Sequence, residues 1–341
     1  MATAQITEEY PITHDPTRAP VPFGRWAPEL LTRWLNTGDV HEKQRTLFTL
    51  CDFLHDPEQI TACLATDLVP ALCRQLEHTD ATVRQKAALC LGVISGHAIG
   101  REDLLKNDVL THLSWRFTDG VPLVRRNVHQ VVVSLLRTPE GVSAGLEVNL
   151  TPLLLQRVVC ELPEIVLLCL RSLQPLLKED PKRGLLLGAV RTMNKLLRSE
   201  ISSIRACAAS CLHNLCRPTQ GKNEATVLGS IPLLVTLLKD WDPAVRTQAA
   251  AALGSVLVTT PAKKLAVTLP TLRHLLDLAV EFAVPAAQML AIQALAVLAA
   301  HPEARNKLRE HVEVFEDAMR SEEEGVRVCA KRAMEEVMWV P

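Results

Sequence analysis

The chain has 341 residues, of which 48% are hydrophobic and only 4% aromatic, and its formal net charge is −1. This balance gives no support for a nucleic-acid-binding protein, and a core of short aliphatic side chains favours packed helices over strands. No stretch approaches the roughly 18 uninterrupted apolar residues of a membrane span, and the N-terminus has no basic or apolar signal region. Without an export signal, we interpret the ten cysteines as reduced, which predicts a cytoplasmic or cytoskeletal setting.

The first predicted element is an extended, proline-containing arm over residues 1–25. Five prolines lie between residues 9 and 35, so the first half of that stretch must be extended or turning. Composition alone also fits a disordered tail. Apolar side chains such as Tyr10 and Phe23 nevertheless favour docking against another surface. We therefore predict an arm over residues 1–25 and a helical repeat domain over residues 26–341.

Beyond the arm, the sequence repeats at a period of about 40 residues. The stretch DATVRQKAALCLG at residues 80–92 returns as DPAVRTQAAAALG at residues 242–254. Taking the arginine of this pattern as an anchor, equivalent positions recur at steps of 39 to 41 residues. The eight anchors are Lys43, Arg84, Arg125, Val166, Arg205, Arg246, Ala287 and Arg327.

Each period is predicted to hold three helices. In the clearest period, leucines at 233, 234, 237 and 238 follow the spacing of one helical face, and Asp242 and Pro243 supply an N-cap and a first helical residue. A short helix before these two completes the unit, as over residues 101–108. The chain therefore resembles armadillo-repeat proteins. The resemblance implies an all-α, right-handed α-solenoid of about eight three-helix units, whose third helices line a partner-binding groove. Residues 178–200 are compressed, so a unit boundary there stays open.

Two stretches contain residues that could carry catalysis or bind a metal. GVSAG at residues 141–145 matches the nucleophile elbow around Ser143, but no strand is predicted before it, so we interpret it as a flexible loop. Cys207, Cys211, His213 and Cys216 lie close in sequence without a second cluster at zinc-site spacing, so we interpret them as packing residues. We expect no enzyme, cofactor, metal or small-molecule substrate.

The arginine anchors are predicted to be structural. Asp80 with Arg84 and Asp242 with Arg246 have the favourable order and spacing of ion pairs within a helix. The long aliphatic stem can also cover apolar surface between units while the guanidinium reaches acids or helix-end carbonyls. The anchors interpreted in this way are Arg84, Arg125, Arg205, Arg246 and Arg327.

The predicted groove does not resemble that of nuclear import carriers. Those proteins carry a tryptophan five positions after the anchor and an asparagine nine positions after it. Here the fifth positions hold no tryptophan, and the ninth hold one asparagine, Asn214. Residues 121–222 contain 14 Lys or Arg against 7 Asp or Glu, which suggests an acidic partner. From their third-helix position, we expect partner contacts at Gln130, Arg171, Ser210, His213 and Asn214.

The N-terminal block resembles one branch of the armadillo proteins, the radial spoke head 14 family of the ciliary and flagellar axoneme. The residues that carry this resemblance are Tyr10-Pro11, Asp15-Pro16-Thr17-Arg18-Ala19, Phe23-Gly24, Leu50-Cys51-Asp52 and His55-Asp56-Pro57-Glu58. The resemblance implies a structural subunit of the radial spoke, located in the cytoskeleton of the cilium or flagellum and contacting other spoke proteins. Candidate contacts in the arm are Tyr10, Asp15, Thr17, Arg18 and Phe23. A soluble armadillo adaptor or ciliary assembly factor is the alternative. We expect no nucleic-acid or membrane partner.

Overall fold

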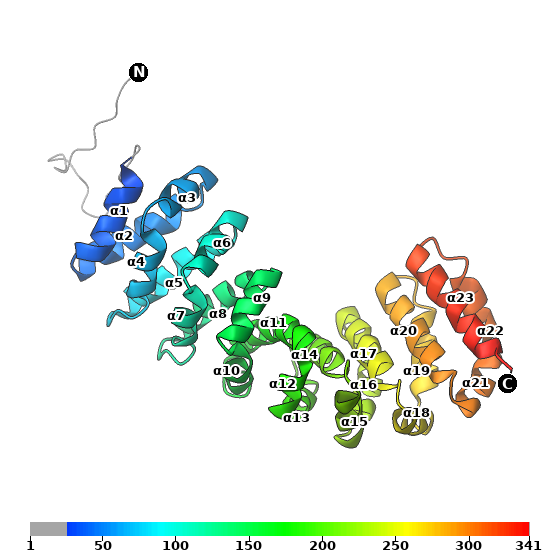
Figure 1. The fold of residues 1–341 in the computed structure, drawn as a ribbon. Coiled ribbons are helices and arrows are strands. Elements are labelled where there is room, and N and C mark those ends of the chain that lie inside the picture. Colours follow the sequence, from blue (N-terminus) through cyan, green and yellow to red (C-terminus); the bar gives the residue numbers. More distant parts are fainter. Residues whose placement is uncertain (1–25, 341) are drawn as a thin grey trace. The chain divides into compact units, whose positions relative to one another are not determined.

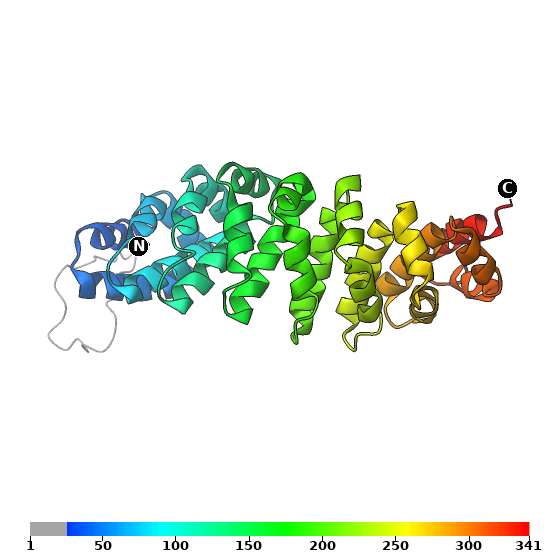
Figure 2. The same cartoon turned by 90° about the horizontal axis from the view of Figure 1, so that it is seen from below.

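The computed structural model describes residues 26–340, and within this range every regular element is a helix (Figures 1 and 2). The prediction of an all-α repeat fold is therefore confirmed. Over the same range, no helix combines the length and the apolar character that a bilayer crossing needs. The predicted arm over residues 1–25, with Tyr10, Asp15, Thr17, Arg18 and Phe23, lies outside the described residues.

The chain divides into two compact units, residues 1–153 and 154–341. The helices of the first unit are α1 (Ala27–Thr37), α2 (Val40–Phe53), α3 (Pro57–Leu64), α4 (Leu68–Gln75), α5 (Ala81–Ser95), α6 (Ala98–Lys106), α7 (Val109–Ser114), α8 (Pro122–Leu135) and α9 (Pro139–Glu147). The division falls within α10 (Leu150–Arg157). The helices of the second unit are α11 (Pro163–Glu179), α12 (Pro181–Leu186), α13 (Ala189–Leu196), α14 (Ser202–Leu215), α15 (Thr219–Val227), α16 (Ser230–Leu237), α17 (Pro243–Val256), α18 (Thr260–Val267), α19 (Thr271–Ala279), α20 (Pro285–Leu298), α21 (Pro302–Arg309), α22 (Val312–Ala318) and α23 (Glu324–Met338).

Eight long helices set the period of the fold: α2, α5, α8, α11, α14, α17, α20 and α23. Two shorter helices precede each of them except α2, which only α1 precedes among the described residues. We call the long helices the third helices. In the first compact unit α2 packs on α5 and α5 on α8; in the second, α11, α14, α17, α20 and α23 pack each on the next. The predicted three-helix periodicity is thus observed.

Local sequence explains where these helices begin. The Asp242 carboxylate accepts a hydrogen bond from the Ala244 amide at 2.8 Å, and Pro243 opens α17 as predicted. Asp39 forms a reciprocal capping box with Glu42 at the start of α2. Between neighbouring third helices the core uses small side chains, and Ala249 and Ala291 are fully buried. Small residues at the crossings let the helix axes approach closely.

The anchor position in α20 differs from the sequence-based assignment. In the other third helices the anchor is the fourth helical residue, but α20 begins at Pro285, which makes Gln288 its fourth residue. Gln288 is followed by Leu295 seven positions later, and both are buried. The prediction of Ala287 as the anchor is therefore one residue out of register. A polar side chain replaced the basic one, so the pattern gave no signal there.

The GVSAG stretch is helical. Residues 141–145 lie inside α9, where the Thr138 hydroxyl caps the helix by accepting from the Gly141 amide at 3.2 Å. A Cβ on Gly141 would lie 1.9 Å from the Leu135 carbonyl oxygen, so this position requires glycine. The interpretation of the stretch as a flexible loop is wrong, because the glycine serves a close approach between α8 and α9.

The compressed stretch over residues 178–200 still forms a complete unit. Its first helix, α12, has only six residues, and α13 follows from Ala189. Asp180 caps α12 by accepting a hydrogen bond from the Arg183 amide at 3.1 Å. The three-helix repeat is therefore shorter here because its first helix, α12, is short.

Candidate functional site

The Arg84 guanidinium joins two successive units of the repeat. Its Nη1 donates to the carbonyl oxygens of His78 and Thr79, at 2.9 and 2.8 Å, in the turn before its own helix. Its Nε and Nη2 donate to the two carboxylate oxygens of Asp119, at 2.7 and 3.1 Å. Asp119 lies 35 residues later, in the turn before α8, and also accepts from the Val121 amide at 2.9 Å. The arginine therefore ties the start of α5 to the turn before α8.

The same arrangement recurs in the second compact unit. Arg205 donates through Nη1 to Ser199 and Glu200 carbonyls, at 2.8 and 2.9 Å, and through Nε and Nη2 to Asp240, at 2.7 and 2.8 Å. The Asp240 carboxylate then accepts from the Asp242 amide at 3.0 Å. Both partners of the Arg205–Asp240 ion pair are buried, with 10% and 7% of their side chains exposed.

Arg246 continues this series. Its Nη1 donates to the carbonyls of Asp240 and Trp241, at 3.0 and 3.2 Å, while Nη2 pairs with the carboxylate of Glu281, again 35 residues later. Asp240 therefore receives Arg205 on its carboxylate and Arg246 on its carbonyl. We call these linked contacts the arginine ladder, with rungs Arg84–Asp119, Arg205–Asp240 and Arg246–Glu281.

The ladder differs from the expected pairing within one helix. Asp80 accepts hydrogen bonds from the Val83 amide at 2.9 Å and the Gln44 side chain at 3.1 Å, and it forms no ion pair with Arg84. Asp242 is likewise occupied as an N-cap. The acids at the helix start are used for capping, so the arginine reaches forward to the next unit instead.

The two remaining arginine anchors also reach turn carbonyls. Arg125 Nη1 donates to the Asp119 carbonyl at 2.8 Å. Arg327 Nη1 donates to the carbonyls of Ser321 and Glu322, at 2.9 and 2.7 Å. In every arginine anchor, then, one guanidinium nitrogen donates to one or two backbone carbonyls in the turn before its own helix.

Electrostatics favour the ionised ladder. Burial acts to raise the pKa of the Asp119 carboxyl, but hydrogen bonds from Arg84 and the Val121 amide, with the positive charges of Arg84 and Arg116, outweigh it. The pKa of Asp119 is thereby held below its ordinary value. The hydrogen bond to Asp119 correspondingly raises the pKa of Arg84. The pair is charged at neutral pH.

The candidate groove residues fall into two groups. Gln130 and Arg171 are exposed on their helices, and Ser210 is half-buried. His213 and Asn214 instead have contacts between helices: His213 Nδ1 lies 2.8 Å from the Ser255 hydroxyl, and Asn214 Nδ2 donates to the Gln174 carbonyl at 3.0 Å. These polar residues belong in part to the packing of third helices. Their role in partner binding stays a prediction.

The cysteine cluster also packs between helices. Cys211 is fully buried, and its Sγ lies 3.6 Å from the Leu170 carbonyl oxygen of α11. Burial raises the pKa of the Cys216 thiol to about 12, so the thiol is protonated at neutral pH. Among residues 26–340, no group of three or more His, Cys, Asp or Glu is arranged to hold a metal ion.

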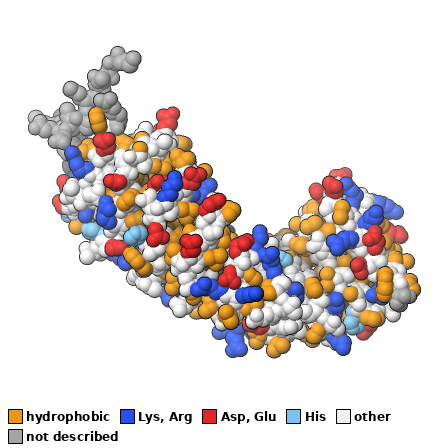
Figure 3. Space-filling model, in the orientation of Figure 1, with side chains coloured by type: hydrophobic (Ala, Val, Ile, Leu, Met, Phe, Trp, Pro, Cys, Tyr) orange, Lys and Arg blue, Asp and Glu red, His pale blue; other side chains and the backbone are white. Residues whose placement is uncertain are grey.

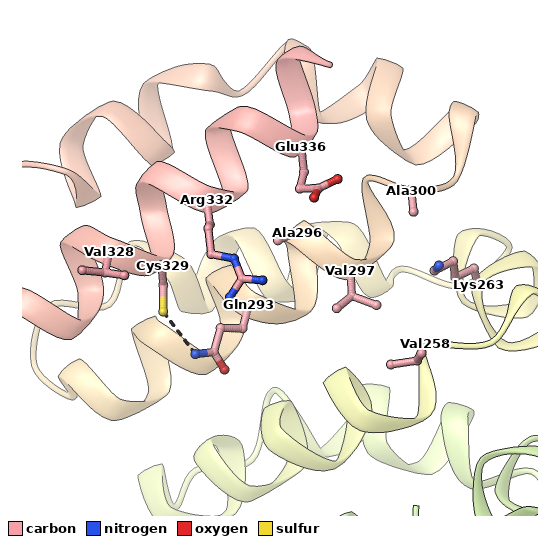
Figure 4. Close-up of a pocket in the computed structure, with 10 residues that line it drawn as sticks. All are labelled: Val258, Lys263, Gln293, Ala296, Val297, Ala300, Val328, Cys329, Arg332 and Glu336. Atoms are coloured by element: carbon pink, nitrogen blue, oxygen red, sulfur yellow. Dashed lines mark hydrogen bonds between the residues drawn. The ribbon is translucent and has the colours of Figure 1, made fainter. Parts of the chain in front are cut away.

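A pocket of about 400 Å³ lies between α20 and α23, beside the end of α17 (Figure 4). The sequence did not predict this pocket, because the anchor predicted for α20, Ala287, lies one residue before the true anchor, Gln288. With Gln288 as the anchor, the fifth position becomes the exposed Gln293 rather than the buried Ile292. The pocket is lined by Val258, Lys263, Gln293, Ala296, Val297, Ala300, Val328, Cys329, Arg332 and Glu336.

Acidic and basic side chains are interspersed over the molecular face seen in Figure 3. No single sign of charge dominates that face, in agreement with the formal net charge of −1. A preference for a charged partner must therefore come from the local arrangement along particular helices.

Comparison with known proteins places this arrangement among helical repeats. Residues 183–297 match the family model described as stalled ribosome sensor GCN1-like HEAT repeats, and residues 68–98 match the HEAT repeat model. An engineered protein of known structure aligns with a TM-score of 0.84 at 23% identity, over 92% of this chain and 79% of that one. The chain has a HEAT/armadillo-type repeat fold.

Designed proteins show the same fold. A computationally designed armadillo repeat protein for modular peptide recognition aligns with a TM-score of 0.63 at 19% identity, over 67% of this chain and 98% of that one. A designed armadillo repeat protein in complex with the peptide (KR)4 aligns with a TM-score of 0.61, also at 19% identity and with the same coverage. A scaffold of repeated helices of this kind is suited to binding peptides and proteins.

Proposed function

We propose that this protein is a non-enzymatic structural subunit of the ciliary or flagellar radial spoke, acting as a protein-binding scaffold in the axoneme. The observation that supports the scaffold role is the arginine ladder. Its largely buried ion pairs hold successive units together, and their guanidinium groups already donate hydrogen bonds within the protein. Exposed third-helix positions such as Arg171 are left for partners. A repeat with fixed internal contacts presents a long surface at little cost in conformational entropy.

The axonemal setting rests on the N-terminal sequence block and the first unit. Of the residues that carry this resemblance, Leu50 to Glu58 span the end of α2 and the start of α3, where Asp56 caps α3 by accepting from the Glu58 amide at 2.9 Å. Other radial spoke proteins are the proposed partners. The proposal predicts stable incorporation, since a structural subunit remains in its assembly when soluble proteins are removed.

Fractionation of ciliated cells tests this proposal. A tagged full-length chain should remain with doublet microtubules after detergent and moderate salt, and cross-linking mass spectrometry of isolated axonemes should join it to spoke proteins. Tubulin and a soluble cytoplasmic protein provide the pellet and supernatant controls. Recovery of the whole population in the detergent-soluble pool would reject the spoke-subunit role and favour the soluble adaptor or assembly factor.

A further inference from the structure

Three rows of residues run along one face of the third helices in the second compact unit. Positions five, nine and twelve after the anchor lie within about 60° of one another around a helix of 3.6 residues per turn. The fifth row is Arg171, Ser210, Ala251, Gln293 and Arg332, and the ninth is Pro175, Asn214, Ser255, Val297 and Glu336. The twelfth begins with Lys178 in α11 and continues with Arg217, Val258 and Ala300, which lie two residues after the ends of α14, α17 and α20. We call these rows the third-helix face.

The charge on this face is predominantly positive. Arg171, Lys178, Arg217 and Arg332 are exposed cations within the rows, and Glu336 is their one carboxylate. One guanidinium nitrogen of Arg217, Nη1, donates to the Lys178 carbonyl at 2.6 Å. Lys263 adds a fifth cation at the edge, where it lines the pocket. A surface with this excess attracts acidic segments and repels basic ones, even though the whole chain is almost neutral.

The pocket supplies an apolar recess within this positive face. Its volume of about 400 Å³ is in the usual range of sites that enclose a small ligand or a side chain. Ala296 and Val297 of α20 form one part of the lining, and Val258, in the turn after α17, and Val328 of α23 form another (Figure 4). Short side chains at these positions leave the recess open.

The cations at the recess are free to bind a partner. Unlike the ladder arginines, the side chains of Arg332 and Lys263 make no hydrogen bond or ion pair with any described residue, and they are not paired with Glu336. Gln293, in the same recess, donates its Nε2–H to the Cys329 sulfur at 3.1 Å and keeps its amide oxygen available. Unpaired cations beside an apolar recess can pair with carboxylates without first breaking a contact.

We propose that the third-helix face of residues 154–341 binds an extended acidic segment of a partner protein, with one apolar side chain in the recess beside Arg332. Carboxylates that flank this side chain pair with Arg332 and Lys263. Where the acidic segment of the partner continues across the preceding third helices, its further carboxylates reach Arg217 and Arg171. This inference names the chemistry of the partner and rests on the scaffold function proposed above.

Fluorescence anisotropy with the full-length chain tests the proposal. The probe is a labelled peptide with the sequence Glu-Glu-Leu-Glu-Glu, compared with Lys-Lys-Leu-Lys-Lys and with an otherwise identical acidic peptide that has glycine for leucine. The acidic leucine peptide should bind, the basic peptide should not, and loss of the leucine should weaken binding. Rising salt should weaken binding too.

Matched variants separate the recess from general charge. Arg332→Glu should weaken binding of the acidic peptide about tenfold, because it replaces an attractive contact with a repulsive one. Lys331→Glu changes the net charge equally on an adjacent exposed position of α23 outside the pocket, and should leave the dissociation constant within about twofold. Ala300→Trp, which fills the recess from an exposed position, should also abolish the preference for leucine. Circular dichroism and melting temperature confirm folding of each variant.

Three results would overturn the inference: no binding of the acidic peptide, equal binding of the basic peptide, or equal loss in Arg332→Glu and Lys331→Glu. Binding of single-stranded RNA in preference to the acidic peptide would also reject it and assign the positive face to a nucleic acid. The scaffold function has its own readout, because retention in axonemes does not depend on the peptide. If the protein is retained in axonemes but does not bind the peptide, the proposed scaffold function stands and the proposed peptide site is rejected.

Discussion

At the scale of single residues, arginines have two different roles in the third helices: some join neighbouring units, and others are exposed to solvent. Arg205 is buried, bonds to two carbonyls and a carboxylate, and has little capacity left for a partner. Arg171, in the preceding third helix, is exposed. The repeat register separates them, because Arg205 is the anchor of its helix and Arg171 lies five positions after the anchor Val166. The sequence does not show which carboxylate Arg205 reaches, because Asp240 lies 35 residues away.

This distinction predicts effects of different size on stability. Arg205→Ala leaves the Asp240 carboxylate buried without its ion-pair partner, and should lower the free energy of unfolding by about 3 kcal/mol. Arg171→Ala, at an exposed position, should change it by less than about 0.5 kcal/mol. Urea denaturation followed by circular dichroism measures both. Equal stability of the two variants would contradict the assignment of Arg205 to the ladder.

The Asp119 carboxylate predicts a dependence of stability on pH. Its folded pKa lies below its unfolded value of about 3.9, so the folded state favours the ionised form. The resulting stabilisation is complete above the unfolded pKa and is lost as the pH falls through the folded pKa. The stability difference between the natural chain and Asp119→Asn should therefore shrink below about pH 4. Denaturation between pH 3 and 7 tests this, and a constant difference would argue against it.

At the scale of elements, composition and spacing predicted most of the helices. The Asp-Pro start of α17 is a local signal and the anchor period is a repeat of the sequence itself, so both could be predicted from the chain. The ladder could not, since its partners lie 35 residues apart in turns that no periodicity marks. The pocket was missed for a similar reason: Gln288 replaces the expected basic anchor and conceals the register of α20.

The joint between α8 and α9 gives a prediction for the GVSAG stretch. Gly141→Ala places a Cβ against the Leu135 carbonyl oxygen, which cannot move without disturbing the end of α8, and should destabilise the chain by about 1–3 kcal/mol. Gly120→Ala is the matched control, because a Cβ there meets no atom within 4 Å. Thermal unfolding compares the two variants. Tolerance of Gly141→Ala would mean that this close approach is not required.

At the scale of the whole molecule, stability should be distributed by neighbouring contacts. In a repeat fold each unit is stabilised mainly by the units it touches. Arg205→Ala should therefore increase amide hydrogen exchange most in α14 and α17 and least in α2 and α5 of the first compact unit. Exchange followed by mass spectrometry measures this. A uniform increase along the chain would indicate that the fold unfolds as one cooperative body.

The 35-residue reach of each ladder rung also restricts how the length of the repeat can vary. An insertion or deletion between an arginine and its carboxylate would move the acid out of reach, because the guanidinium has a fixed span. Using Gln288 as the anchor of α20, the two shortest steps in the chain, both of 39 residues, follow Val166 and Gln288. Neither of these positions carries a basic side chain. The two shortest steps therefore follow anchors that carry no ladder rung, and deletions in these two units should be tolerated better than deletions within a rung.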